Sequence, residues 1–376
     1  MEHVNGWQDS LLEDAVDPPD LKIPNSNVAV DLKIIDSTSR LTAPMHMFIQ
    51  PPIEGHEQLD CPSFAFLIQH PTGRKVLFDI GTRKDVENLP PAVLKIFTEH
   101  SLGAQVQKDV FEILEEHEFG VSQGAIEAVI WSHWHYDHIG DISKYPASTD
   151  LVVGPGFKEA FIPGYPLRED GLIRQSDYEG RELKEISFDA TTDIRIGGFL
   201  AHDFFGDGSF YLLDTPGHAI GHICGLARVT AGQGSDSTFV FMGGDACHHG
   251  GEFRPTKFLP LPKRIKLPPT PVWPTGICPG DVMQKLHFKN DACSPFYDVS
   301  QDFPLNREQL LSTIDKMQEF DAAPNVFVVL AHDQTLLDMG MDMFPKSVND
   351  WKSKAYDVEG RWGFLNDFAK AAEKFL

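Results

Sequence analysis

Four short apolar segments of this chain each run into a histidine or an aspartate. Their β-branched and aromatic content predicts strands at residues 125–131, 210–213, 238–242 and 326–330. The polar residues that follow these segments are, in the same order, His133, His218, Asp245 and His332. Because ligands of α/β sheets gather beyond the carboxyl ends of the strands, this pattern predicts a sheet edge at which the four side chains meet.

The densest cluster of such residues follows the first of these segments. The motif His133-x-His135-x-Asp137-His138 places three imidazoles and one carboxylate within six residues. Neutral imidazole and carboxylate are suitable ligands for zinc and for non-haem iron. Four polar groups buried at a strand end without a partner would be costly, so the motif predicts a metal site rather than a packed core.

The ligand-type residues of the chain are sufficient for two metal sites. His133 and His135 can reach one ion, and Asp137 and His138 can turn to a neighbouring ion. We expect one site to hold His133, His135 and His218, and the other to hold Asp137, His138 and His332, with Asp245 bridging both. These ligand types fit zinc, iron and manganese alike.

Strands and helices alternate along most of the chain. This favours one α/β domain at residues 28–376, preceded by an acidic, proline-bearing arm at residues 1–27. Further strands are expected at residues 28–35, 64–68, 76–80, 151–153, 185–188, 194–200 and 222–229. Helices are expected at residues 91–118 in two segments split near Gly103, after the capping pair Asn306 and Gln309, and at residues 362–376.

A proline-rich segment interrupts this alternation. Residues 253–280 hold eight prolines and five basic residues but no acidic one. A segment with so many prolines cannot form a helix interior or a central strand. We therefore expect a lid or a long ordered loop within an insertion at residues 253–300. If the segment is a lid, its Trp273, Phe258 and Leu261 would line an apolar pocket, and its basic residues would bind a carboxylate of the bound molecule. As a structural loop, it would pack on the domain or contact a second chain.

The charge balance excludes several classes of function. Thirty-two basic residues against 55 acidic ones give a net charge of −23, which repels nucleic acid and anionic membranes. No apolar run is long enough to span a membrane, and the acidic start lacks the basic flank of a secretory signal. Five scattered cysteines are typical of reduced thiols. We therefore expect a cytoplasmic protein that acts on a small molecule, with a homodimer as one possible assembly.

The order of these motifs resembles the metallo-β-lactamase superfamily, whose hallmark is HxHxDH followed by His, Asp and His. The match runs from about residue 28 to His332 and includes an early aspartate, here Asp79. The resemblance implies a four-layer αβ/βα sandwich that holds two zinc ions per chain at one edge, between its two sheets. It also implies that Asp79 orients a ligand imidazole or its loop.

The bridging aspartate narrows the resemblance. The true β-lactamases of this superfamily lack an aspartate at the position of Asp245, whereas glyoxalase-II-type thioesterases and N-acyl homoserine lactonases keep it. Residues 215–222 resemble the PGHxxGH segment of the lactonases, and residues 245–248 resemble their Asp-Ala-Ser-Tyr segment, with His248 in place of tyrosine. Residues 131–141 and 247–255 look like the fungal branch of lactonase-like enzymes, some of which open benzoxazolinone lactams. The resemblance therefore implies hydrolysis of a lactone or lactam, such as a xenobiotic or a secondary metabolite.

A mechanism follows from the ligand set as a hypothesis. Two metal ions held there would lower the pKa of a water molecule that they share, so that its hydroxide could attack a carbonyl group, and Asp137 would relay the proton to the leaving atom. His248 or His249 donates a hydrogen bond to the developing oxyanion. His222 lies either behind the ligands or in the core.

Two other functions remain open from the sequence. A thioesterase of the glyoxalase-II or acyl-carrier kind shares every ligand, and it would need a basic patch, for which only the bases at residues 254–266 are candidates. An iron-dependent redox enzyme on the same sandwich is the other alternative, although such relatives usually lose some of the seven ligands.

Overall fold

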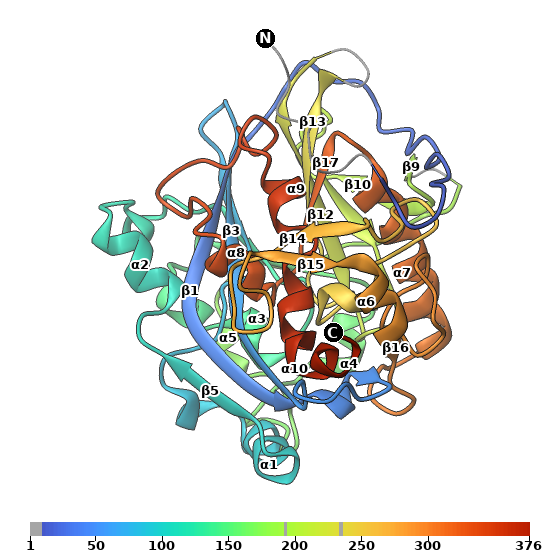
Figure 1. Ribbon diagram of the computed structural model, residues 1–376. Coiled ribbons are helices and arrows are strands. Elements are labelled where there is room, and N and C mark those ends of the chain that lie inside the picture. The colour runs from blue at the N-terminus through green and yellow to red at the C-terminus, as the bar shows by residue number, and fades with distance from the viewer. Residues whose placement is uncertain (1–9, 192–193, 233–235) are drawn as a thin grey trace.

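Two β-sheets packed face to face form the centre of the computed structural model, which describes residues 10–191, 194–232 and 236–376 (Figure 1). The first sheet contains, in spatial order, β5 (Gly103–Val106), β1 (Asp31–Pro44), β3 (Gln58–Gln69), β4 (Lys75–Phe78), β6 (Ala128–Ile130), β7 (Asp150–Val153) and β8 (Leu183–Glu185). The second contains β17 (Val326–Val329), β13 (Thr238–Met242), β12 (Ile223–Thr230), β11 (Phe210–Asp214), β10 (Phe199–Asp203) and β9 (Ile194–Ile196). Both sheets are mixed, because β4, β6, β7 and β8 run parallel, as do β13 and β17, while the other pairs are antiparallel.

Buried side chains on both faces of the strands explain the face-to-face packing. In β13, Val240 and Met242 point into the core between the two sheets, whereas Phe239 and Phe241 point to the opposite face. This alternation follows from the two-residue period of an extended chain. A strand that is apolar at every position therefore needs a layer on each side, and helices supply the outer layers.

The helices cover the two outer sheet faces. Val110 and Leu114 of α2 (Val110–Glu116) pack on the first sheet. Leu310 and Ile314 of α7 (Arg307–Ala322) pack on the second, so that α2 and α7 lie on opposite sides of the molecule (Figure 1). This order of helices, sheet, sheet and helices confirms the expected α/β sandwich. The helices are α1 (Pro91–His100), α2 (Val110–Glu116), α3 (Tyr136–Ile139), α4 (Phe157–Phe161), α5 (Gln175–Tyr178), α6 (Gly280–Leu286), α7 (Arg307–Ala322), α8 (Gln334–Asp338), α9 (Tyr356–Gly360) and α10 (Ala369–Ala372). No helix among the described residues combines the length and the apolarity needed to cross a membrane.

The proline-rich segment forms part of a second core and is not seen as a lid. It contains β14 (Arg264–Lys266) and β15 (Ile277–Pro279), and the insertion continues through α6 to β16 (Asp298–Val299), which pairs with β2 (Ile49–Gln50). Leu261, Ile265 and Trp273 are buried there against C-terminal residues such as Phe364 and Phe368. The prolines keep the chain extended between these apolar anchors, so the segment fills a core instead of folding over an opening.

The described part of the N-terminal arm lies along this segment. The backbone N–H of Leu12 donates to the carbonyl oxygen of Leu261, and that of Val16 donates to the carbonyl oxygen of Lys257. Further on, Leu21 is buried beside the second sheet. Residues 10–27 therefore cover a neighbouring surface without a core of their own, while residues 1–9 lie outside the described residues.

Three expected elements differ from the structure. Val106, expected on a helix, ends β5, whose pairing with β1 overrides the helical pattern. The strand expected at residues 194–200 is a hairpin, because Gly197 and Gly198 have positive φ and turn the chain between β9 and β10. The C-terminal helix is broken into 3₁₀ turns around α10, whose buried side chains fill the second core.

Candidate metal centre

The polar residues expected at the sheet edge all follow the carboxyl ends of strands. Asp79 follows β4, His133 and His135 follow β6, and α3 then carries Asp137 and His138. The second sheet supplies the others from the loops after three of its strands, namely His218 after β11, Asp245 after β13 and His332 after β17. Because β4 pairs with β6 and β13 pairs with β17, both in parallel, these loops leave their sheets at the same edge.

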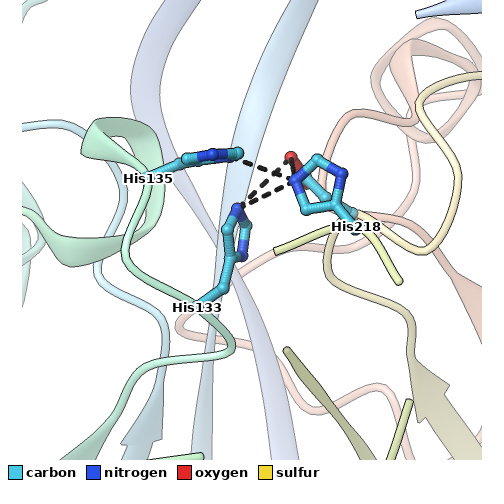
Figure 2. Close-up of side chains that lie close together, drawn as sticks. His133, His135 and His218 are labelled. Carbon is cyan, nitrogen blue, oxygen red and sulfur yellow. Dashed lines mark hydrogen bonds and ion pairs between the residues drawn. The ribbon is translucent and has the colours of Figure 1, made fainter. Parts of the chain in front are cut away.

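The first group of ligand atoms consists of three imidazoles. Nε2 of His218 lies 3.2 Å from Nε2 of His133 and 3.0 Å from Nδ1 of His135. Figure 2 shows the three rings converging from two different loops. Burial lowers the pKa of His133 and of His218 well below the usual range and lowers the pKa of His135 to about 3. All three rings are therefore neutral at pH 7, which is the form that binds metal ions.

The second group lies beside the first. Nε2 of His332 is 3.3 Å from Oδ2 of Asp137, and Nε2 of His138 is 3.6 Å from the same oxygen. Nδ1 of His332 donates to the carbonyl oxygen of Pro62 at 2.8 Å, which fixes the tautomer so that Nε2 presents its lone pair.

Asp245 separates the two groups and faces both. Its Oδ2 lies 3.6 Å from Nε2 of His133 and 3.4 Å from Nε2 of His218. Its Oδ1 lies 3.0 Å from Nε2 of His138 and 3.0 Å from Nε2 of His332. Each carboxylate oxygen thus serves one group, which is the arrangement that a carboxylate bridging two metal ions requires.

The donor set fits two divalent cations. Nε2 of His138 and Oδ1 of Asp245 are fully buried, yet neither makes a hydrogen bond of acceptable geometry. Buried polar atoms are almost always hydrogen-bonded, so these two atoms are the expected signature of an ion as the missing partner. Among the described residues, potential ligand atoms that lie within 4.8 Å of one another form two such groups. One consists of His133, His135, His218 and Asp245, and the other of Asp137, His138, Asp245 and His332.

Asp79 and His222 support the ligands from behind. Asp79 accepts a hydrogen bond from Nδ1 of His138 at 2.9 Å and another from the backbone N–H of Ser132 at 2.7 Å. His222 donates from Nδ1 to the carbonyl oxygen of Thr215 at 2.9 Å, and its Nε2 accepts from the backbone N–H of Asp245 at 3.1 Å. Both residues are buried and contact the ligand loops rather than the point of convergence.

The side chains of the adjacent residues His248 and His249 point to different places. The ring of His248 faces the metal centre, with Nε2 at 3.4 Å from Oδ2 of Asp245, and it stacks on Phe48 at 4.4 Å between ring centroids. His249 is the other histidine that the sequence placed beside the ligands. Its side chain instead points to His56 and Asp367.

The cluster of His56, His249 and Asp367 has hydrogen bonds that account for it without a metal ion. Nδ1 of His249 accepts from the backbone N–H of Gly251 at 3.0 Å, so the neutral ring carries its hydrogen on Nε2. That hydrogen is donated to Oδ2 of Asp367 at 3.1 Å, which leaves no lone pair on Nε2 for a cation.

An apolar cavity of about 190 Å³ opens over the candidate metal centre. Asp137, Asp245 and His248 lie at its polar floor, and its walls include Phe48, Val93, Ile96, Phe97 and Phe303. No lysine or arginine is found among the described residues that line it, and none of its lining comes from residues 253–300. The sequence analysis missed these walls, although the apolar stripe of residues 93–97 was a signal that α1 covers something.

Comparison with known proteins agrees with this geometry. The family model of the metallo-β-lactamase superfamily matches residues 59–229. The gamma-lactamase FDB1 of Fusarium pseudograminearum is 42% identical over 96% of this chain and 87% of its own length. The chain belongs to the metallo-β-lactamase superfamily. It is also 44% identical to the metallo-hydrolase mfmC of Annulohypoxylon moriforme, over 94% of this chain and 91% of that protein.

Solved structures of N-acyl homoserine lactone hydrolases share the fold. An N-acyl homoserine lactone hydrolase, solved with N-hexanoyl-L-homoserine at its metal centre, superposes with a TM-score of 0.54 at 16% identity. The superposition covers 86% of this chain and all of the other. The gamma-lactamase and the metallo-hydrolase match this chain along nearly its whole length. The chain is therefore a metal-dependent hydrolase.

Proposed function

We propose that this metallo-β-lactamase superfamily member is a dinuclear hydrolase that opens a cyclic ester or amide in an uncharged, largely apolar small molecule. The observation that carries the proposal is the position of Asp245, between two groups of ligand atoms and beneath an apolar cavity. The gamma-lactamase among its relatives supports a ring substrate. Zinc is the expected metal, although iron and manganese suit the same ligands.

The proposed ligands are His133, His135 and His218 for one ion, Asp137, His138 and His332 for the other, and Asp245 for both. Two divalent ions bound there supply a water molecule of lowered pKa and polarise a carbonyl group. Asp79 and His222 keep the tautomers and the loop backbone in place. The apolar walls exclude bulk water from the ring and orient it over the ligands.

Asp137 is proposed to carry the proton. It lies at the cavity floor, and burial raises the pKa of its carboxyl group. Hydrolysis adds a hydroxyl group to the carbonyl carbon and breaks its bond to the ring oxygen or nitrogen, so the second proton of the water must reach that leaving atom. Because Oδ2 faces His138 and His332 as the ligand oxygen, the other carboxylate oxygen, Oδ1, is the one proposed to accept this proton and to donate it to the leaving atom.

His248 is proposed to stabilise the negative charge that develops on the substrate carbonyl oxygen. His248 lines the cavity, and its Nε2 makes no hydrogen bond of acceptable geometry with the other described residues. A buried N–H group that is free to donate toward the reacting carbonyl acts as one half of an oxyanion hole. His248→Ala should therefore lower kcat while metal content stays unchanged, and wild-type kcat in this variant would refute the role.

The thioesterase alternative finds less support in the structure. Glutathione and phosphopantetheine carry anionic groups, and the bases at residues 254–266 were the candidates to bind them. Arg254 is buried and pairs with Asp321, and Lys266 pairs with Glu359 away from the cavity. Because no lysine or arginine lines the cavity among the described residues, the anionic groups of such a carrier have no basic side chain to bind there.

A pooled substrate screen read by mass spectrometry tests the proposal. The pools hold γ- and δ-lactones, aryl-fused lactams and carbamates, and acyl thioesters, and the wild type is run beside Asp137→Ala. Turnover with a gain of one water, confined to cyclic esters or amides and absent in the variant, is the expected result. Turnover confined to thioesters would replace the proposal by the thioesterase alternative.

A further inference from the structure

A second cavity, of about 210 Å³, adjoins the cavity over the candidate metal centre. Four residues line both cavities, namely Leu59, Cys61, His248 and His332. Because His332 is also a proposed metal ligand, a molecule held over the ligands lies next to the second cavity. The proposed reaction so far uses only the first cavity.

The second cavity differs from the first in the chemistry of its lining. It is lined by Asp60, Asp333 and Asp367 and by no lysine or arginine among the described residues. Asp333 is already engaged, because it caps α8. A Cβ atom on Gly55 would lie 2.8 Å from the side chain of Lys370, so this lysine runs along the rim of the cavity. Within the described residues, however, neither Asp60 nor Asp367 has an ion pair with a lysine or arginine.

His56 adds a buried ring nitrogen without a partner to the same cavity. The residue is 8% exposed, and its Nδ1 lies 2.7 Å from the hydroxyl group of Tyr297. Its Nε2 lies 4.0 Å from Oδ2 of Asp367, which is beyond hydrogen-bond distance. Burial and the neighbouring ring of His249 lower the pKa of His56 to about 4, so the ring is neutral at pH 7. Buried polar atoms are almost always hydrogen-bonded, so Nε2 indicates a missing partner in the cavity.

The polar atoms left free in this cavity are suited to accept hydrogen bonds. Tyr297 can accept from Nδ1 of His56, which leaves a lone pair on Nε2, and the two carboxylates only accept. His249 has no free donor, because its Nε2–H is donated to Asp367 and its Nδ1 accepts a backbone N–H. A primary ammonium group matches these atoms, since its three N–H groups meet acceptors and its charge meets two carboxylates. An anionic group would be repelled.

We propose that the second cavity binds a primary ammonium group, and that the reaction supplies this group when a lactam ring opens. The inference rests on the proposed function, because ring opening is what creates the group. The hydroxyl group of water bonds to the carbonyl carbon, the C–N bond breaks, and the nitrogen takes up the proton that Asp137 carries. The amine then takes the proton of the new carboxylic acid. One uncharged lactam and one water thus become a single product with an ammonium and a carboxylate.

The change of charge explains why two unlike cavities adjoin. An uncharged ring is at home among apolar walls, but an ammonium group left there would be costly to bury. The acceptors of the second cavity stabilise the ammonium group once it forms. A lactone releases a hydroxyl group instead, and an aryl lactam releases a weakly basic amine that is neutral at pH 7. We therefore expect a product with an aliphatic ammonium group to bind more tightly than the matching hydroxy acid.

The first experiment needs neither a ring substrate nor turnover. The zinc-loaded protein is titrated with n-butylammonium, and n-butanol and butyrate serve as the uncharged and anionic counterparts. The imidazole ¹⁵N resonances of His56 are identified by their loss in His56→Gln. We expect butylammonium alone to shift them in a saturable way, with an affinity about tenfold lower in Asp367→Asn, where a charged acceptor is lost. No saturable shift, an equal shift with butanol, or an unchanged affinity in Asp367→Asn would overturn the inference.

Two controls separate a site from the general attraction of an ammonium ion to an acidic protein. His70 directly follows β3, at the end of that strand opposite to the cavity, and its Nε2 is 2.7 Å from Oδ2 of Asp207. Its resonances should show no saturable shift. Asp315→Asn removes one negative charge from an exposed position of α7 that lines neither cavity, and it should leave the affinity for butylammonium unchanged. A loss equal to that in Asp367→Asn would overturn the inference.

The second experiment connects the cavity with the reaction. With a ring substrate from the pooled screen, 4-aminooctanoate and 4-hydroxyoctanoate are compared as inhibitors of the wild type. We expect the amino acid to bind about tenfold more tightly, and this difference to disappear in Asp367→Asn. Equal inhibition of the wild type by the two acids would overturn the assignment of the released amine. No turnover of any ring substrate would refute the proposed function, whereas the butylammonium titration would still decide whether the cavity binds an ammonium group.

Discussion

Asp79 accepts a hydrogen bond from Nδ1 of His138 at 2.9 Å, and this bond turns Nε2 of His138 toward Asp245. Asp79 itself has φ of 56°, in the left-handed region that asparagine and aspartate tolerate best. The same carboxylate holds the backbone of Ser132, next to the first ligand. One residue at the end of β4 thus fixes a ligand tautomer and the start of the loop that carries it.

Asp79→Asn should weaken metal binding about 10- to 100-fold, because the ligand imidazole loses a charged acceptor on its other nitrogen. Asparagine keeps the turn, so the unfolding temperature of the metal-loaded protein should change little. Equilibrium dialysis against a competing chelator, followed by elemental analysis, measures the affinity. Metal retention equal to that of the wild type would contradict the support that Asp79 gives to His138.

Removal of metal should destabilise the protein and abolish turnover. The seven proposed ligands are buried or nearly so, and an ion that binds only the folded chain raises its free energy of unfolding. Dialysis against a chelator should lower the unfolding temperature, and added zinc should restore it. In Asp245→Ala, added zinc should restore neither stability nor turnover, since both groups lose their shared carboxylate. A full recovery in this variant would contradict the bridging role.

Phe97→Ala should raise KM about tenfold for an apolar ring substrate and leave kcat within a factor of two, because Phe97 forms a wall of the cavity and not its floor. Phe288→Ala is the matched control, since Phe288 is 49% exposed and lies outside the cavity lining. Steady-state kinetics of both variants on one substrate give the comparison. Equal KM values in the two variants would show that α1 does not contact the substrate.

Asp321→Ala should lower the free energy of unfolding by about 3–5 kcal/mol, because it leaves the guanidinium of Arg254 buried without its partner. The exposed pair of Lys266 and Glu359 serves as the control, and Glu359→Ala should change stability by less than about 0.5 kcal/mol. Urea denaturation measures both. A small effect of Asp321→Ala would indicate that the start of the proline-rich segment is only loosely attached.

Asp177 should make stability depend on pH. Burial raises the pKa of Asp177 to about 7 in the folded protein, against about 3.9 in an unfolded chain. The folded state therefore holds this proton more tightly, and its contribution to stability is complete below pH 4 and is lost as the pH rises to 7. Asp177→Asn removes this dependence. The free energy of unfolding of the variant, relative to that of the wild type, should therefore rise by up to about 4 kcal/mol between pH 4 and pH 8. Parallel stability curves of the two proteins would contradict the shifted pKa.

Much of the architecture could be predicted because it is coded by local patterns. The strands β6, β11, β13 and β17 are short apolar runs, and the polar residues after them need only follow the chain to reach the sheet edge. The cap of α7 is likewise local, since Asn306 accepts the backbone N–H of Gln309 at 3.1 Å. Where a long-range pairing competes with a local pattern, as for Val106 in β5, the sequence alone was misleading.

The proline-rich segment shows the same limit on a larger scale. Its composition excludes a helix interior and a central strand, but it does not say which surface the apolar residues between the prolines will cover. Trp273 and Leu261 are buried with Phe368 from the end of the chain, about a hundred residues away. A lid and a core segment have the same composition, and only the position of the partner surface distinguishes them.

The sequence by itself determined the superfamily and most of the strands, and it supplied the candidate ligand residues, because short local patterns in a fixed order along the chain carry this information. The tertiary structure decided which of two adjacent histidines faces the site. The backbone at His249 is extended, with φ of −151° and ψ of 146°, and neighbouring side chains on extended backbone point in opposite directions. His248 therefore meets Asp245, while His249 meets Asp367. The walls of the cavity were decided in the same way, since α1, Phe48 and Phe303 come together only when distant parts of the chain pack.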